Sequence, residues 1–119
     1  MNGMFEFNLL LDFYGQLLTN RQQEIFDLHY NNDYSLGEIA EQMGISRQGV
    51  YDNIKRGRTS LVGFEEKLGL VGKFLSQKKR AQQVLKKLTQ IKDYPLENGA
   101  SEALDEIQQL IEEIIQESN

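Results

Sequence analysis

A cluster of polar and basic side chains between residues 46 and 58 is the part of this chain best suited to contact another molecule. The cluster consists of Arg47, Gln48, Tyr51, Lys55, Arg56 and Arg58, with Asp52 as its single carboxylate. Arginine and glutamine can make paired hydrogen bonds to guanine and adenine edges, and lysine and arginine neutralise phosphates. A tyrosine can touch a thymine methyl group or a sugar. These residue types favour nucleic-acid recognition.

Two short helices joined by a glycine turn are expected to position this cluster. Ser35 can cap the first helix, and Glu38, three residues later, completes a capping box. Gly44 suits a left-handed C-cap, and Ser46 can cap the second helix. The inward positions, at helical spacing, are Leu36, Ile39, Ala40 and Met43 in the first helix and Val50 and Ile54 in the second. The pattern predicts a helix-turn-helix, and an ordinary hairpin packed for stability is the alternative.

Position within this motif gives each polar residue an expected role. Arg47 and Gln48 fall in the first turn of the second helix, which brings side chains to base edges when a helix enters the major groove. Ser35 and Ser46, with the adjoining helix N-terminal amides, suit phosphate oxygens. The predicted DNA-binding residues are thus Ser35, Ser46, Arg47, Gln48, Tyr51, Lys55, Arg56 and Arg58. The carboxylates of Asp52, Glu38 and Glu41 count against this interpretation, because they would repel phosphates.

The same segment resembles a known family. The stretches Leu18 to Gln22, Ser35 to Ala40 and Gly44 to Val50 resemble region 4 of bacterial sigma factors. The fuller string, with Asp-Leu-His-Tyr at 27–30 and Ser-Arg-Gln-Gly-Val-Tyr-Asp-Asn-Ile-Lys-Arg at 46–56, is similar to the YlxM family. That resemblance implies a helix-turn-helix regulator, linked to the signal recognition particle pathway by gene neighbourhood, and it brings no catalytic or binding residues. An accessory factor that binds the particle's RNA or GTPase is therefore the alternative to a DNA-binding protein.

Composition and length limit the other function classes. The 119 residues include one proline, one histidine and no cysteine, which favours an all-α chain and excludes thiol chemistry. His29 follows Leu28 on a core-facing helix, so a structural role is expected for it. The paired acids such as Glu65-Glu66 are adjacent in sequence and should lie on solvated faces. We therefore expect no enzyme, metal or cofactor, no membrane insertion, and a cytoplasmic location.

The periodicity of apolar residues predicts helices over 4–14, 20–30 and 72–93 and a last helix from 101 onward. The second helix of the motif should continue to about Leu68, with a kink near 69–72 where glycines gather. The expected fold is all-α: a sigma-region-4-like helix-turn-helix domain at 1–70, followed by a C-terminal helical hairpin at 71–119.

Charge is segregated along the chain, whose formal net charge is −5. Residues 67–92 contain eight lysines and arginines and no acid, whereas residues 100–119 contain six acids and no base. The two segments can pair across the hairpin, or the basic one can add to a positive surface. The expected apolar stripes are Leu75, Leu85, Leu88 and Ile91 in one helix and Leu104, Ile107, Ile111 and Ile114, with Ile115, in the other. We expect the uncovered part of these stripes to join a homodimer, and a hairpin that closes the core of a monomer is the alternative.

Overall fold

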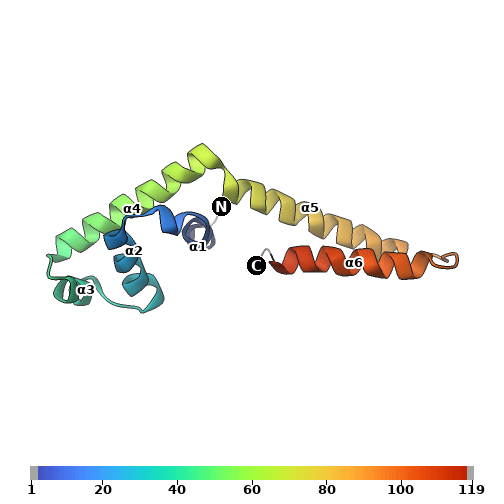
Figure 1. The fold of residues 1–119 in the computed structure, drawn as a ribbon, viewed down its shortest axis with the longest axis horizontal. Helices are drawn as coiled ribbons and strands as arrows, with labels where there is room; N and C mark the ends of the chain where they lie inside the picture. Colours follow the sequence, from blue (N-terminus) through green and yellow to red (C-terminus); the bar gives the residue numbers. More distant parts are fainter. Residues whose placement is uncertain (1–2, 118–119) are drawn as a thin grey trace. The chain divides into compact units, whose positions relative to one another are not determined.

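Helices form all the regular secondary structure of residues 3–117, the part of the chain that the computed structural model describes (Figure 1). The order is α1 (Gly3–Tyr14), the 3-10 turn η1 (Gly15–Leu17), α2 (Asn20–Phe26), the π-helical turn η2 (Asp27–Asn31), α3 (Leu36–Met43), α4 (Arg47–Leu68), α5 (Leu70–Ile91) and α6 (Ala100–Glu117). The expected all-α fold is confirmed. The chain divides into two compact units, Met1–Val71 and Gly72–Asn119, called here the helix-turn-helix unit and the C-terminal hairpin. That they are separate domains stays a prediction.

The second predicted helix, 20–30, is built differently from the expectation. It begins with the predicted capping box, in which the Gln22 amide donates to Thr19 Oγ1 at 3.2 Å and the Gln22 side chain accepts from the Thr19 amide at 3.1 Å. The α-helix ends at Phe26, and a wider π-helical turn continues to Asn31. His29 Nδ1 donates to the Tyr34 carbonyl at 2.9 Å, because a carbonyl oxygen can only accept. The histidine is half-buried and holds the connection to α3.

The core of the helix-turn-helix unit forms where α4 crosses the preceding helices. Ile25, Ile39, Val50 and Leu61 have no exposed surface, and Phe26 is 3% exposed. At Gly57, an added Cβ atom would lie 2.6 Å from Phe26 Cζ, so only glycine permits this approach of α4 to the ring. At Gly63, six residues later on the same helix, nothing lies within 4 Å of such an atom.

The junction of α4 and α5 is a helix break, where a kink was expected. Gly69 adopts a left-handed conformation with φ of 63° and ends α4, and α5 begins at the next residue. The Tyr14 hydroxyl donates to Glu65 Oε1 at 2.6 Å and accepts from the Leu70 amide at 3.0 Å. Glu65 Oε1 also accepts from the Val71 amide at 3.0 Å, so two otherwise unsatisfied amides of the new helix are bound.

The prediction that Glu65 lies on a solvated face was therefore wrong, although its neighbour Glu66 is exposed. The buried partner of Glu65 is Tyr14, which is only 1% exposed. Burial, followed by the hydrogen bond to Glu65, raises the pKa of the Tyr14 phenol above its ordinary value.

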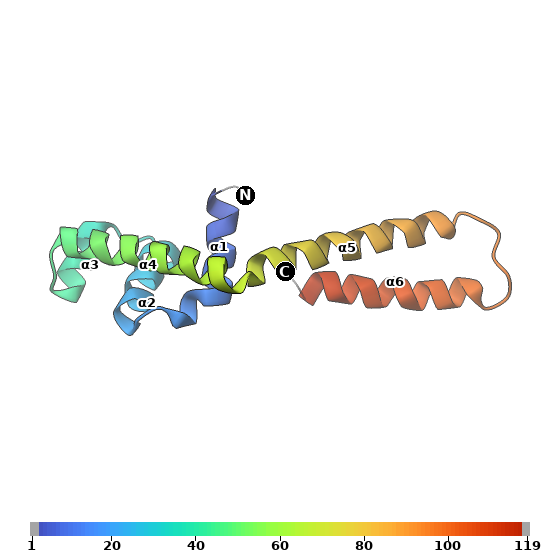
Figure 2. The same cartoon turned by 90° about the horizontal axis from the view of Figure 1, so that it is seen from above.

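The C-terminal hairpin consists of α5 and α6 running antiparallel to each other, as both views show (Figure 2). Lys92 Nζ pairs with Asp105 and donates to Gln108 Oε1 at 3.0 Å, which is one instance of the expected basic–acidic pairing. The expected inner face of α6 is partly wrong, because Ile107 and Ile114 are 43% and 52% exposed.

No helix of the described residues is long and apolar enough to cross a membrane.

Candidate nucleic-acid interface

The predicted helix-turn-helix is formed by α3, Gly44 and α4. Ser35 Oγ accepts from the Glu38 amide at 3.1 Å, and the Glu38 carboxylate accepts from the Ser35 amide at 3.1 Å, which completes the capping box. Gly44 has the left-handed φ of 68° that ends α3. Ser46 Oγ then accepts from the Gly49 amide at 2.9 Å and caps α4. Both serine caps and the glycine turn of the predicted motif are confirmed.

The charged end of this capping box responds to pH. The Ser35 amide and then the Ser35 hydroxyl lower the pKa of the Glu38 carboxyl below its ordinary value, because both favour the ionised form. The Ser46 hydroxyl accepts from the Gly49 amide and still has its own hydrogen to donate, whereas the hydrogen of the Ser35 hydroxyl is directed to the Glu38 carboxylate. A phosphate oxygen is a suitable acceptor for the hydrogen of the Ser46 hydroxyl.

The inward and outward faces of α4 also follow the prediction. Val50 and Ile54 are buried, whereas the six residues Arg47, Gln48, Tyr51, Lys55, Arg56 and Arg58 are exposed. Tyr51 is 49% exposed, so part of its ring is open to a partner. The structure thus brings the predicted side chains to the surface of one helix, with both capping serines at the adjoining helix N-termini.

Two of these side chains are held by neighbours that sequence reasoning did not identify. A Cβ atom added at Gly37 would lie 3.1 Å from Arg47 Nε, so the guanidinium of Arg47 lies against the backbone of α3. Gln48 Nε2 donates to Asp52 Oδ1 at 3.0 Å, one turn along α4. Asp52 therefore orients Gln48, and this contact explains a carboxylate that is otherwise unfavourable on a face meant for phosphates.

Arg58 is more tightly engaged than a free phosphate ligand would be. Its Nε and one terminal nitrogen donate to the Tyr30 hydroxyl at 3.0 and 2.6 Å, and its guanidinium lies 4.4 Å from the centre of the Phe7 ring. These contacts join α4 to η2 and α1, so the side chain stabilises the unit as well as carrying charge. The sequence showed only that Arg58 follows the outer face of the helix.

A concavity of about 390 Å³ adjoins the outer face of α4 and was not predicted. Its lining includes the apolar residues Leu36 and Ile54, and its remaining lining residues are His29, Tyr30, Tyr51, Lys55 and Arg58. The lining thus combines apolar side chains, aromatic rings and two cations. This combination suits the sugar-phosphate backbone of a nucleic acid, since the sugar can pack on the rings while the phosphate meets the cations.

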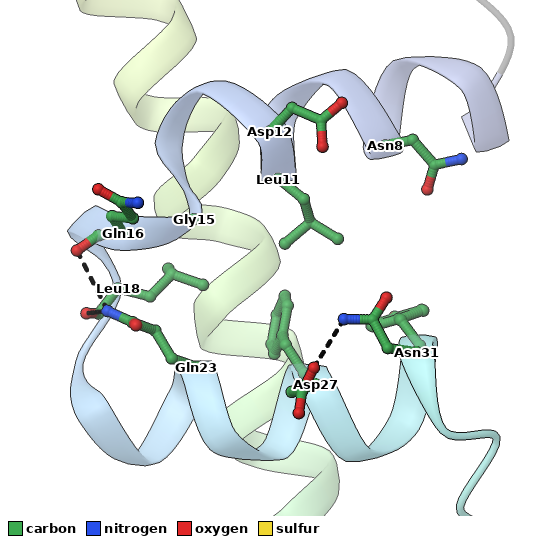
Figure 3. Close-up of a pocket in the computed structure, with 11 residues that line it drawn as sticks. Asn8, Leu11, Asp12, Gly15, Gln16, Leu18, Gln23, Asp27 and Asn31 are labelled. Atoms are coloured by element: carbon green, nitrogen blue, oxygen red, sulfur yellow. Dashed lines mark hydrogen bonds between the residues drawn. The ribbon is translucent and has the colours of Figure 1, made fainter.

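A second, larger concavity of about 1070 Å³ lies between α1 and the α2–η2 segment (Figure 3). Asp12 and Asp27 lie on opposite sides of it, and Asn31 Nδ2 donates to Asp27 Oδ1 at 2.7 Å. The side chain of Gln23 donates to the carbonyl groups of Gln16 and Leu18 at 3.1 and 2.9 Å. The lining contains two carboxylates and no lysine or arginine, so it is unsuited to a phosphate.

Sequence comparison agrees with this geometry. The family described as "Putative helix-turn-helix protein, YlxM / p13 like" matches residues 1–107. A UPF0122 protein of Acetivibrio thermocellus is 58% identical over 116 residues, which cover 98% of this chain and 99% of the relative. A UPF0122 protein of Thermoanaerobacter sp. is 53% identical over 109 residues, covering 92% and 87%. One from Listeria innocua is 50% identical over 82 residues, covering 69% and 74%. The chain therefore belongs to the UPF0122 family of YlxM/p13-like helix-turn-helix proteins.

Proposed function

We propose that this protein is a non-catalytic, cytoplasmic regulator that binds duplex DNA by placing the N-terminal turns of α4 in the major groove. The observation that carries the proposal is the exposed face of α4. Arg47 and Gln48 lie in its first turn, and Tyr51 and Lys55 follow on the same surface. A helix presented in this way offers hydrogen-bonding groups to base edges at its start and cations to phosphates farther along.

The neighbouring elements support a specific orientation of the DNA backbone. The capping serine Ser46 can donate to a phosphate, and the concavity beside Tyr51 can hold a sugar while Lys55 meets the next phosphate. Asp52 keeps the Gln48 amide group in place by accepting its hydrogen at 3.0 Å. Preorganised side chains lose less conformational freedom on binding, which favours selective recognition.

A selected DNA duplex provides the test. Duplexes enriched from a random pool by the wild-type protein are used in anisotropy titrations with Arg47→Ala and Gln48→Ala. Each substitution should weaken binding to the preferred site by about 1–3 kcal/mol and relax base preference, because each removes contacts to a base edge. Lys86→Ala, which removes an exposed cation outside the motif, is the matched control and should change affinity little. If the Arg47/Gln48 double variant binds the duplex as well as the wild type does, direct readout by α4 is wrong.

Salt dependence distinguishes phosphate contacts from a protein partner. With about four phosphates contacted per chain, log affinity should fall against log salt with a slope of roughly −3 to −4. The same titrations with signal recognition particle RNA, and with its GTPase, test the accessory-factor alternative that the family resemblance implies. Tighter binding to either than to every selected duplex would replace the DNA proposal.

A further inference from the structure

The C-terminal hairpin leaves many of its apolar side chains uncovered. Among its described residues, Leu88 is the one large apolar side chain that is buried. The exposed ones are Val84, Ile91, Tyr94, Ile107, Leu110 and Ile114, with exposed fractions between 43% and 70%. The described part of the hairpin itself contains no third helix to cover these faces, whereas stable helical architectures bury each apolar stripe against a neighbour.

Helix α6 carries two separate apolar stripes with the same spacing. The stripe that is half-buried in the hairpin consists of the apolar residues Leu104, Ile111 and Ile115 with the polar Gln108 among them, at steps of four, three and four residues. The second stripe consists of Ala103, Ile107, Leu110 and Ile114, at the same steps, and it is exposed. All other positions from 102 to 116 are glutamate, aspartate or glutamine. Each apolar stripe of a helix packs against one neighbouring helix. Two stripes are therefore typical of a helix that contacts two partners, as in a four-helix bundle.

Helix α5 offers a complementary surface. Its exposed Val84 and Ile91 each follow a basic residue by four positions, Arg80 and Lys87, so an apolar and a basic row run together. The second stripe of α6 is bordered instead by the exposed acids Glu106 and Glu113. The outward faces of the two helices thus both carry exposed apolar residues, four in α6 and two in α5, and they have opposite charge. Two basic α5 faces would repel each other, as would two acidic α6 faces, whereas a basic face and an acidic face attract. The charges therefore favour packing of α5 against α6 of the other chain over packing of either helix against its own copy.

We propose that the second stripe of α6 packs against the outward face of α5 from a second copy of this chain, and that two hairpins form a four-helix bundle. A second copy is the occupant that the charges favour, because a two-fold axis uses the same α5–α6 contact twice and satisfies both faces of both chains. The contact involves only residues of the hairpin. It is therefore independent of whether α4 binds DNA, and it is measured without nucleic acid.

Sedimentation equilibrium of the full chain tests the proposal. The wild type should have twice the chain mass of 13.7 kDa at micromolar concentration. The double variant Ile107→Lys/Leu110→Lys should sediment as a monomer with unchanged helical circular dichroism, because both side chains are exposed within the hairpin. Gln109→Lys/Gln116→Lys adds the same two charges at exposed polar positions of α6 and should leave the dimer intact. A wild-type mass near 13.7 kDa throughout the micromolar range would overturn the proposal.

A charge exchange identifies the partner surface. A chain with Glu106→Lys and Glu113→Lys has two basic outward faces, and a chain with Arg80→Glu and Lys87→Glu has two acidic ones. Each chain alone should dimerise at least tenfold more weakly than the wild type, and an equimolar mixture should recover the dimer because both contacts are again complementary. A mixture that associates no better than its separate components would show that α6 does not meet α5 of the other copy.

Discussion

The helix-turn-helix unit and the C-terminal hairpin differ in how completely they bury their own apolar residues. Among the residues whose burial the structure describes, twelve of the thirteen buried apolar ones lie between Phe7 and Val71, and Leu88 alone lies in the hairpin. In the first unit, α4 meets apolar faces from α1, α2 and α3, so a core can close inside one chain. In the hairpin, two helices cover only one face of each other. Helical content is thus similar in the two regions, but only the first has an interior of its own.

The largest effect is expected from charge placed in that interior. Val50→Asp should lower the free energy of unfolding by about 3 kcal/mol or more, because Val50 has no exposed surface and the carboxylate would be buried without a partner. Near-ultraviolet circular dichroism of the tyrosines during urea unfolding reports the loss. Ile107→Asp, the same kind of change on the hairpin's exposed stripe, should leave unfolding of the helix-turn-helix unit unchanged. If both substitutions lowered the free energy of unfolding of the helix-turn-helix unit equally, the two regions would not differ in the way described.

A close helix contact gives the next largest effect. Gly57→Ala should destabilise the helix-turn-helix unit by about 1–3 kcal/mol, since the new methyl group would overlap the buried Phe26 ring. Gly63→Ala is the matched control on the same helix. It has open space around it and should gain up to about 1 kcal/mol from helix propensity. Thermal unfolding of both variants gives the comparison, and a stabilised Gly57→Ala would show that α4 and Phe26 can separate.

Removal of one hydroxyl at the end of the unit should have a smaller effect. Tyr14→Phe loses the hydrogen bonds to Glu65 and to the Leu70 amide, which should lower the free energy of unfolding by about 1 kcal/mol. Because burial raises the pKa of Tyr14 above the ordinary value of 10.0, its contribution is fully present below pH 10 and is lost as pH rises through the folded-state pKa. Urea unfolding at neutral and alkaline pH measures the free energy of unfolding in the wild type and in Tyr14→Phe. If both lose stability equally steeply at alkaline pH, the loss comes from a group other than Tyr14.

The smallest effect is expected at the capping box of α3. The pKa of Glu38 is lowered in the folded protein, so its contribution is present above the unfolded-state pKa and is lost as pH falls through the folded value. Glu38→Gln should keep the box, as Gln22 does for α2, while removing this acid dependence. Glu97→Gln, in the loop between α5 and α6, serves as the control. The urea midpoint of unfolding is measured at several pH values between neutral and acidic. If the midpoint of Glu38→Gln falls with pH as steeply as that of the wild type, the acid dependence does not come from Glu38.

The candidate interface was predicted from sequence in its positions but not in its contacts. Residues 47, 48, 51, 55, 56 and 58 are exposed as expected, because a cap and an inward pair fix which way every other residue of a helix points. The rest of the chain decides what each side chain touches. The contact of Arg58 with Tyr30 spans 28 positions, and the support of Arg47 by Gly37 depends on how α3 crosses α4.

Sequence alone determined the caps at Thr19, Ser35 and Ser46 and the turn at Gly44, because each depends on hydrogen bonds and backbone conformations within three or four residues. It did not determine the partners of Glu65. Glu65 was expected to be solvated because the next residue, Glu66, is also an acid. Folding instead brings Tyr14, 51 positions away, to its carboxylate. It also did not determine which stripe of α6 faces α5, because two stripes have the same spacing and their periodicity is identical. Tertiary packing decides which stripe of α6 contacts α5, since a helix can turn only one of its two apolar faces toward a single neighbour.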